Sequence, residues 1–378
     1  MNHPFVDVLD RLPIDDIRER LDDSTPNEVR QAIALGPKAS LEQAAALFSP
    51  AAATLLEEMA QRAHLLSLKR FGRVIQLYAP IYLSNECVNV CKYCGFSAIN
   101  QIPRITLTVD RVEREADHLI AEGFQHILLV SGEHPRHVPT DYIVECIDRL
   151  RDKVASISIE VAPFDEPDYA RIVQAGCEGL ILYQETYHRP TYAEMHPKGY
   201  KRNFNYRLET LQRGANAGMK RLGMGFLLGL AEWRREAICM LAHARHLQRH
   251  CWRSQLSVSF PRLRPAAGEF EPIAPVPDPE FVQLITALRI LLPEAGLTIS
   301  TRESPFLREH LLALGVTWMS AGSKTEPGGY EAPEPEGEQF HIADERPAHV
   351  VAQRIRDLGY EAVWKDWDSS FNGVTTLH

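Results

Sequence analysis

Residues 74–94 read VIQLYAPIYLSNECVNVCKYC, an apolar run that leads directly into a loop with three closely spaced cysteines. A short apolar run without polar alternation is typical of a strand that is buried on both faces, so we predict a strand over 74–79. Cys87, Cys91 and Cys94 follow it in a C-x3-C-x2-C pattern. The stretch therefore predicts a buried parallel strand whose carboxyl end carries a thiol-based site.

The alternation of a buried strand with an amphipathic helix repeats along the chain. Apolar runs that predict strands occur at 74–79, 127–130, 155–161, 179–183, 221–228, 255–260, 297–300 and 316–320. Helix-favouring stretches follow the first seven runs, at 109–122, 142–151, 168–175, 206–217, 234–249, 280–292 and 305–314. In the first of these, apolar residues recur at helical spacing from Val112 to Ile120. Eight repeats favour an α/β fold with a closed (βα)8 TIM-type barrel, and an open doubly wound sheet is the alternative.

Two further regions flank the predicted barrel, which occupies residues 71–320. Residues 1–70 are rich in Ala, Leu, Glu and Gln and contain no strand-like run, so they predict a helical N-terminal extension. Residues 321–378 begin with a segment rich in glycine, proline and glutamate, and later contain Trp364 and Trp367. Because large aromatic side chains are seldom left exposed, we expect this C-terminal extension to close the barrel or to dock a partner.

Composition disfavours several classes of protein. The 378 residues are 45% hydrophobic and 24% charged, and the formal net charge of −9 disfavours a nucleic-acid-binding role. The longest nearly apolar stretch, 222–231, is far shorter than the ~20 residues that a transmembrane helix needs. The first residues do not resemble a secretory signal. Seven unevenly placed cysteines do not form a disulfide framework, so we expect a cytoplasmic protein in a reducing compartment.

The number of cysteines in the C-x3-C-x2-C pattern limits the kind of metal site. A structural zinc site or an ordinary ferredoxin cluster uses four protein ligands, and no fourth ligand lies at a suitable spacing. Three thiolates can hold three irons of a [4Fe-4S] cluster, which leaves the fourth iron open to a substrate or cofactor. An iron–sulfur electron carrier or a structural metal site is the alternative. That alternative does not explain the polar motifs at the predicted strand ends.

The cysteine pattern, with the aromatic Tyr93 before its last cysteine, resembles the signature of radical S-adenosylmethionine (SAM) enzymes. In that superfamily the open iron chelates the amino and carboxylate groups of SAM, and the resemblance places Tyr93 beside the adenine. Ser131, Gly132 and Glu133 resemble the motif that binds the methionine amino group. The run GFLLG, which begins at Gly225, resembles the motif that packs against adenine.

Longer motifs resemble the ThiH family, the tyrosine lyases (2-iminoacetate synthases) of bacterial thiazole biosynthesis. They are YAPIYLSN (78–85), SIEV (158–161), YQETYH (183–188), SVSFPRLRP (257–265), STRES (300–304), SKTEPGGY (323–330) and WKDWD (364–368). The resemblance implies that L-tyrosine is cleaved at its Cα–Cβ bond to 2-iminoacetate and p-cresol, while SAM gives methionine and 5′-deoxyadenosine. It also implies two protein partners, a thiazole synthase (ThiG) and a flavodoxin- or ferredoxin-type reductant.

The resemblance also implies roles for individual residues on the cofactor side. Arg207 resembles the position that contacts the carboxylate of SAM, and a surface helix arginine is the alternative. Glu160 and Glu185 end predicted strands and could face ribose hydroxyls or the substrate amine, with structural ion pairing as the alternative.

On the substrate side, the resemblance implies that Arg302 holds the substrate carboxylate, because an arginine can grip a carboxylate through two parallel hydrogen bonds. A salt bridge with Glu303 or Glu185 is the alternative. Tyr82, Ser84 and Glu303 are the other residues predicted to act on this side, although Tyr82 could equally be ordinary packing.

Other residues carry weaker signals. His134 and His188 follow strand ends and could orient groups or relay protons. A related hydrogenase-maturation tyrosine lyase carries an additional C-terminal cysteine cluster. This chain has no cysteine after Cys251, so the reaction products of that relative are disfavoured here. Within the same superfamily, a lyase that acts on tryptophan or another amino acid is the alternative function.

Overall fold

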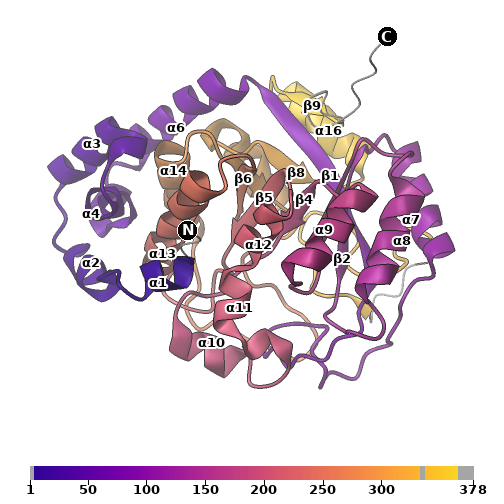
Figure 1. Cartoon of the computed structure of the whole chain (residues 1–378). Helices are drawn as coiled ribbons and strands as arrows, with labels where there is room; N and C mark the ends of the chain where they lie inside the picture. The colour runs from indigo at the N-terminus through magenta and orange to yellow at the C-terminus, as the bar shows by residue number, and fades with distance from the viewer. Residues whose placement is uncertain (1–3, 333–336, 365–378) are drawn as a thin grey trace, which may run out of the picture.

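The computed structural model describes residues 4–332 and 337–364, and its centre is a closed barrel of eight parallel strands (Figure 1). The strands are β1 (Val74–Ser84), β2 (His126–Ser131), β3 (Ser156–Glu160), β4 (Gly179–Ile181), β5 (Arg221–Gly225), β6 (Gln255–Ser259), β7 (Gly296–Ile299) and β8 (Trp318–Ser320). Each strand pairs with the next, and β8 pairs with β1 to close the barrel. The predicted (βα)8 barrel is therefore confirmed, and the open sheet is wrong.

A ninth strand, β9 (Glu361–Val363), pairs with the amino-terminal end of β1 and was not predicted. β1 is longer than the predicted 74–79: its residues 79–84 pair with β2, whereas residues 74–76 pair with β9. β9 therefore lies beside the part of β1 that extends beyond β2. Next to it, the Trp364 ring packs edge-on against Phe124, with ring centroids 4.9 Å apart. Trp367 lies outside the described residues.

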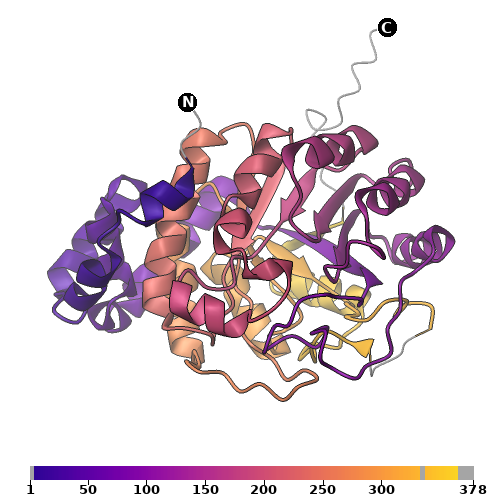
Figure 2. The same ribbon diagram turned by 60° about the horizontal axis from the view of Figure 1, so that its bottom comes forward.

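Helices surround the barrel between successive strands (Figures 1 and 2). They are α7 (Val109–Ala121), α8 (Thr140–Leu150), α9 (Glu166–Ala175), α10 (Arg189–Met195), α11 (Phe204–Leu208), α12 (Thr210–Asn216), α13 (Trp233–His250), α14 (Asp278–Leu291) and α15 (Pro305–Leu311). The single helix predicted over 206–217 is divided into α11 and α12 at Glu209. The Glu209 carboxylate accepts a hydrogen bond from the Val6 amide (2.7 Å), which joins this break to the N-terminal helices.

Six helices precede the barrel, and most of them pack against α13 or α14. They are α1 (Phe5–Leu9), α2 (Ile14–Arg20), α3 (Pro26–Leu35), α4 (Leu41–Ala45), α5 (Pro50–Ala53) and α6 (Leu56–Phe71). α5 begins at Pro50, because proline lacks the amide hydrogen that would continue a preceding helix. Ser49 caps the new helix by accepting a hydrogen bond from the Ala52 amide. No helix among the described residues is long and apolar enough to cross a membrane.

Residues 321–332 and 337–347, between β8 and α16 (Ala348–Asp357), lie across the carboxyl ends of the strands, and we call them the crossing segment. In Figure 2 this yellow segment runs beside the violet loop that follows β1, and the Gly95 amide donates to the Gln339 carbonyl at 3.2 Å. The Glu115 carboxylate of α7 accepts hydrogen bonds from the amides of Tyr330 and Glu331. Further along, the fully buried Asp344 carboxylate pairs with the fully buried Arg308 of α15. The segment is thus attached to both sides of the barrel mouth.

We predict that Asp344→Ala lowers the free energy of unfolding by about 3–5 kcal/mol, because it leaves the buried Arg308 charge without its carboxylate partner. Urea denaturation followed by circular dichroism measures this change. Asp357→Ala, at an exposed position of α16, is the control and should change the free energy by less than about 0.5 kcal/mol. Equal effects of the two substitutions would show that the Arg308 pair does not hold the segment.

Candidate active site

The loop that follows β1, which we call the cysteine loop (residues 85–108), carries Cys87, Cys91 and Cys94. Its backbone is fixed by two other segments, because Val88, Val90 and Lys92 donate amide hydrogen bonds to the carbonyls of Glu133, Lys198 and Met195. All three cysteines are free thiols. Cys94 packs in one cluster with Cys91 and in another with Cys87, so the three thiols lie in one group. Burial raises the pKa of Cys91 well above its ordinary value, against the opposing charge of Lys201.

The donor set in this loop fits a [4Fe-4S] cluster with one open iron. Three thiols come together, and the other four cysteines (Cys146, Cys177, Cys239 and Cys251) are buried in the main hydrophobic core. No fourth cysteine of the described residues therefore reaches the loop. Burial raises the pKa of the Cys87 thiol to about 11, and bound iron would hold such a thiol in its ionised form.

Gly132, at the end of β2, packs directly against the cysteine loop. A Cβ atom at this position would lie 2.3 Å from the Glu86 carbonyl oxygen and 3.3 Å from the Cys87 Cβ, so only glycine permits the contact. The Gly132 amide also donates to the Ser84 carbonyl at 2.8 Å. The adjacent Ser131 hydroxyl is buried and has no hydrogen-bond partner within the described chain.

Four charged side chains that are largely shielded from solvent lie beside the cysteine loop. Arg207 donates to the Glu133 carboxylate (2.9 Å) and to the Glu185 carboxylate (3.4 Å), and Lys201 donates to Glu185 at 2.7 Å. Burial alone would raise the pKa of Glu185, but the charges of Lys201 and Arg207 hold it below its ordinary value. Arg207 is 6% exposed, so it is not a surface arginine. Lys201 had no recognisable sequence signal.

Asn89 connects these charges to the cysteine loop. Its side-chain amide donates to the Glu133 carboxylate (2.7 Å), and its side-chain oxygen accepts from the Lys201 amide (2.9 Å). Gly199 has a φ of 100° and lies so close that a Cβ there would be 2.2 Å from the Asn89 oxygen. The arrangement fixes the cysteine loop against the charged side chains.

Tyr93 lies in a mainly apolar cluster beside these charges, with the Lys201 ammonium 5.7 Å from the centroid of its ring. Its ring packs with Cys91, Leu227 and Leu230, and its hydroxyl hydrogen-bonds to His196 at 2.7 Å. Leu227 belongs to the run that begins at Gly225, so the two segments that resemble the adenine site lie together. A Cβ at Gly225 would come within 2.6 Å of the Ser259 carbonyl oxygen, and this glycine allows β5 and β6 to pack closely.

A cavity of about 60 Å³ opens at the centre of the mouth and is lined by Tyr82, Glu160, Tyr183, Arg302 and Phe340, among others. The Arg302 guanidinium stacks on the Phe340 ring, 3.3 Å from its centroid. Arg302 forms no ion pair within residues 4–332 and 337–364, so the alternative of a salt bridge with Glu303 or Glu185 is wrong. The Tyr82 hydroxyl donates to Gln339 at 2.9 Å.

Glu160, the last residue of β3, is a carboxyl group in the same cavity. It has no hydrogen bond or ion pair with any described residue. Burial raises its pKa from an ordinary value of 4.5 to about 7, and the neighbouring Glu185 carboxylate adds to the rise. The structural ion pairing that was the alternative for Glu160 is absent from the described residues, whereas Glu185 has such pairs.

Two predicted substrate-side residues do not reach the cavity. Glu303 is fully buried, and its carboxylate pairs with Arg262 and Arg264. Ser84 is also buried; its hydroxyl hydrogen-bonds to Thr106 at 2.8 Å and accepts from the Glu86 amide. Neither residue lines the cavity, so the prediction that they contact the substrate directly is corrected. Each polar group already has hydrogen-bond or ion-pair partners within the protein.

A larger cavity of about 330 Å³ lies at the opposite, amino end of the barrel, where Phe71, Val74 and Gln255 line it. It contains none of the predicted site residues. Barrel enzymes carry their chemistry at the carboxyl ends of the strands. We therefore assign the active site to the mouth, where a second small cavity of about 70 Å³ is lined by both Cys94 and Arg302.

Comparison with known proteins agrees with this geometry. Residues 81–243 match the Radical SAM superfamily, and residues 259–361 match the Biotin and Thiamin Synthesis associated domain. The chain is 44% identical over 366 residues to 2-iminoacetate synthase of Escherichia coli (strain K12), which covers 97% of each protein. The same enzyme of Salmonella typhimurium is also 44% identical, with the same coverage.

Among solved structures, the fold is similar to HydG, a maturase of the [FeFe]-hydrogenase, with a TM-score of 0.89 and 32% identity. The match covers 95% of this chain and 81% of HydG. Methylornithine synthase shares the fold at a TM-score of 0.67 and 20% identity. Because 44% identity extends over nearly the full length of both synthases, this chain belongs to the 2-iminoacetate synthase family of the radical SAM superfamily.

Proposed function

We propose that this chain cleaves the Cα–Cβ bond of L-tyrosine to give 2-iminoacetate and p-cresol, while SAM is cleaved to methionine and 5′-deoxyadenosine. Membership of the 2-iminoacetate synthase family supports the reaction. The observation that carries the proposal is the position of Arg302, whose guanidinium has no carboxylate partner in the described chain and lines the same small cavity as Cys94. A carboxylate-binding group thus lies beside the thiols that would hold the cluster.

The protein would hold its cofactors through two groups of residues. Cys87, Cys91 and Cys94 would bind three irons of the cluster, and Glu133, Arg207, Tyr93 and the segment at Gly225 would contact SAM. When bound, the reduced cluster and SAM supply a radical that can take a hydrogen atom from the substrate. Such chemistry requires a site that excludes water and fixes the substrate in near-contact.

The substrate would be held by two charged groups of opposite sign. Arg302 would bind the tyrosine carboxylate through two parallel hydrogen bonds, and Phe340 restricts the guanidinium to one plane. Glu160 would accept a hydrogen bond from the tyrosine amino group, since its carboxyl has no other partner among the described residues. The two residues would orient the amino group for hydrogen abstraction.

The walls of the cavity would accommodate the phenol ring and exclude water. Tyr78, Tyr82, Tyr183 and Phe260 line it along with Phe340, and aromatic rings favour contact with another aromatic ring. The Tyr82–Gln339 hydrogen bond connects the first strand to the crossing segment above the cavity. We propose that this segment keeps the site closed during the reaction.

The product suggests the partners. 2-Iminoacetate hydrolyses readily in water, so rapid transfer to a thiazole synthase would protect it. A flavodoxin- or ferredoxin-type protein would supply electrons to the cluster. Both partners follow from the family resemblance, and we propose that the enzyme works with them in the cytoplasm.

An anaerobic assay tests the reaction directly. Cluster-loaded protein with dithionite, SAM and tyrosine should give tyrosine-dependent 5′-deoxyadenosine together with p-cresol, which mass spectrometry detects. Cys91→Ala should abolish both products, whereas Cys251→Ala, at a core cysteine far from the loop, should retain them. Deoxyadenosine without p-cresol, or with an indole product from tryptophan, would assign the chain to a different radical lyase.

The role of Arg302 predicts a defect in tyrosine use. Arg302→Ala should lower kcat/KM for p-cresol formation by roughly 10- to 100-fold, mainly through KM, because a charged hydrogen bond to the carboxylate is lost. Arg302→Lys should fall between Ala and the parent, since it keeps the charge without the planar fork. Arg356→Ala, at an exposed position of α16, is the control. An unchanged KM for tyrosine in Arg302→Ala would exclude this residue from substrate binding.

The raised pKa of Glu160 predicts a pH-dependent stability difference. Between pH 4.5 and about 7 the unfolded chain ionises this carboxyl more readily than the folded chain, so folding loses stability as pH rises through this range. Glu160→Gln removes the ionisation. The free energy of unfolding of this variant, minus that of the parent, should therefore increase from about pH 5 to pH 7 and stay constant above about pH 7. Urea denaturation of the cofactor-free chain measures this. Glu145→Gln, at an exposed position, should show no such trend.

A further inference from the structure

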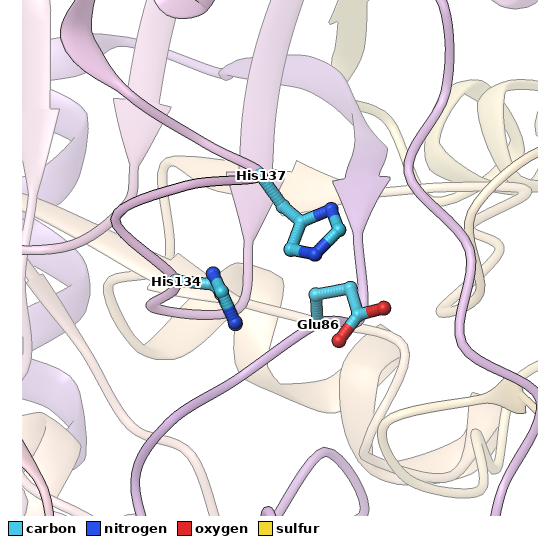
Figure 3. A group of neighbouring side chains, drawn as sticks. All are labelled: Glu86, His134 and His137. Atoms are coloured by element: carbon cyan, nitrogen blue, oxygen red, sulfur yellow. The ribbon is translucent and has the colours of Figure 1, made fainter.

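A second group of metal-binding side chains lies outside the cavity, at the junction of the loops after β1 and β2. Glu86, His134 and His137 each offer one ligand atom, and the three atoms all lie within 4.8 Å of one another. Figure 3 shows the two imidazole rings and the Glu86 side chain as neighbours, contributed by the two loops. None of the three side chains lines the cavities of the mouth.

The backbone holds these three residues in fixed positions. The Gly132 amide donates to the Ser84 carbonyl, and Gly132 packs directly on the Glu86 backbone. The Val138 amide donates to the His134 carbonyl at 2.9 Å, which forms a helical turn. In such a turn residues three apart share a face, and the rings of His134 and His137 lie 4.4 Å apart. The backbone of both loops therefore helps to hold the three side chains close together.

Protein partners do not already satisfy the ligand atoms. The Glu86 carboxylate and the His137 ring form no hydrogen bond or ion pair with any residue of the described ranges. His134 Nδ1 accepts from the Arg136 amide at 3.3 Å, which is long for a hydrogen bond. Coordination of a metal through Nε2 would place the ring proton on Nδ1 and give up this weak contact.

The kind of ligand indicates the kind of metal. Two imidazoles and one carboxylate bind Zn²⁺, Fe²⁺ and similar divalent ions, and water completes the coordination. Hard ions such as Mg²⁺ and Ca²⁺ prefer oxygen ligands alone. The set also differs from the all-thiol cysteine loop, so the two sites select metals by different chemistry.

We propose that Glu86, His134 and His137 form a second metal site, which binds one divalent transition-metal ion and joins the loop after β2 to the cysteine loop. Glu86 directly precedes Cys87, and His134 directly follows Glu133. An ion at this position would therefore fix the distance between a cluster ligand and a predicted SAM-binding residue. It would act from outside the cavity and would not touch the substrate.

Zinc titration of the cluster-loaded protein tests the site. Tag-free holoprotein, kept anaerobic, should bind one Zn²⁺ per chain by isothermal titration calorimetry. His137→Ala and Glu86→Gln should each weaken this binding by about tenfold or more, because each removes one of three protein ligands. His349→Ala is the matched control, since His349 is also exposed but lies on α16. It should bind zinc as the parent does.

The coordination of the bound zinc separates this site from displacement of the cluster. Zinc-edge X-ray absorption should show nitrogen and oxygen ligands at about 2.0–2.2 Å and no sulfur at about 2.3 Å. Zinc–sulfur bonds would mean that the ion has entered the cysteine loop, and this would overturn the proposal. Binding that is unchanged in His137→Ala, or absent from the parent protein at micromolar zinc, would overturn it as well.

Discussion

The buried ion pairs around Arg207 hold together parts of the barrel mouth that are far apart in sequence. Each charge taken out of water costs several kcal/mol unless an opposite charge is close. Here two cations, Arg207 and Lys201, face two carboxylates, Glu133 and Glu185, so the four charges compensate one another. Asn89 extends this set into the cysteine loop. The position of the thiols thus depends on charges contributed by the loops after β2 and β4, by α11 and by the segment that leads into it.

The strands and most helices could be predicted because their signal is local. A buried parallel strand is a short run in which apolar residues predominate or alternate with small polar ones, and an outer helix has one apolar stripe, so both patterns are visible within a short window. β9 carries no such signal. Its three residues are placed by the length of β1, which extends beyond β2 and leaves an unpaired edge. Such a short strand forms because a neighbouring strand offers unpaired backbone groups, and its own sequence contains no pattern that predicts it.

The site could be predicted in part for a related reason. Residues at strand ends, such as Glu160 and Arg302, reach the mouth because parallel strands all end on the same side of a barrel. Glu303 fails this rule although it is adjacent to Arg302, because neighbouring residues need not face the same side and Arg262 binds its carboxylate. Lys201 and Phe340 are brought to the site by tertiary contacts alone, and no spacing in the sequence connects them with the cysteines.

The segment that covers the mouth follows β8 in the sequence, and this order has a consequence for how the enzyme is made. All eight barrel strands and the cysteine loop are synthesised before Gln339 and Phe340 leave the ribosome. The Cys94 thiol, which contacts Gln339, can therefore be covered by the later segment only after the rest of the barrel has been synthesised. Cluster delivery before this segment docks would meet a more open site than the one the finished protein presents.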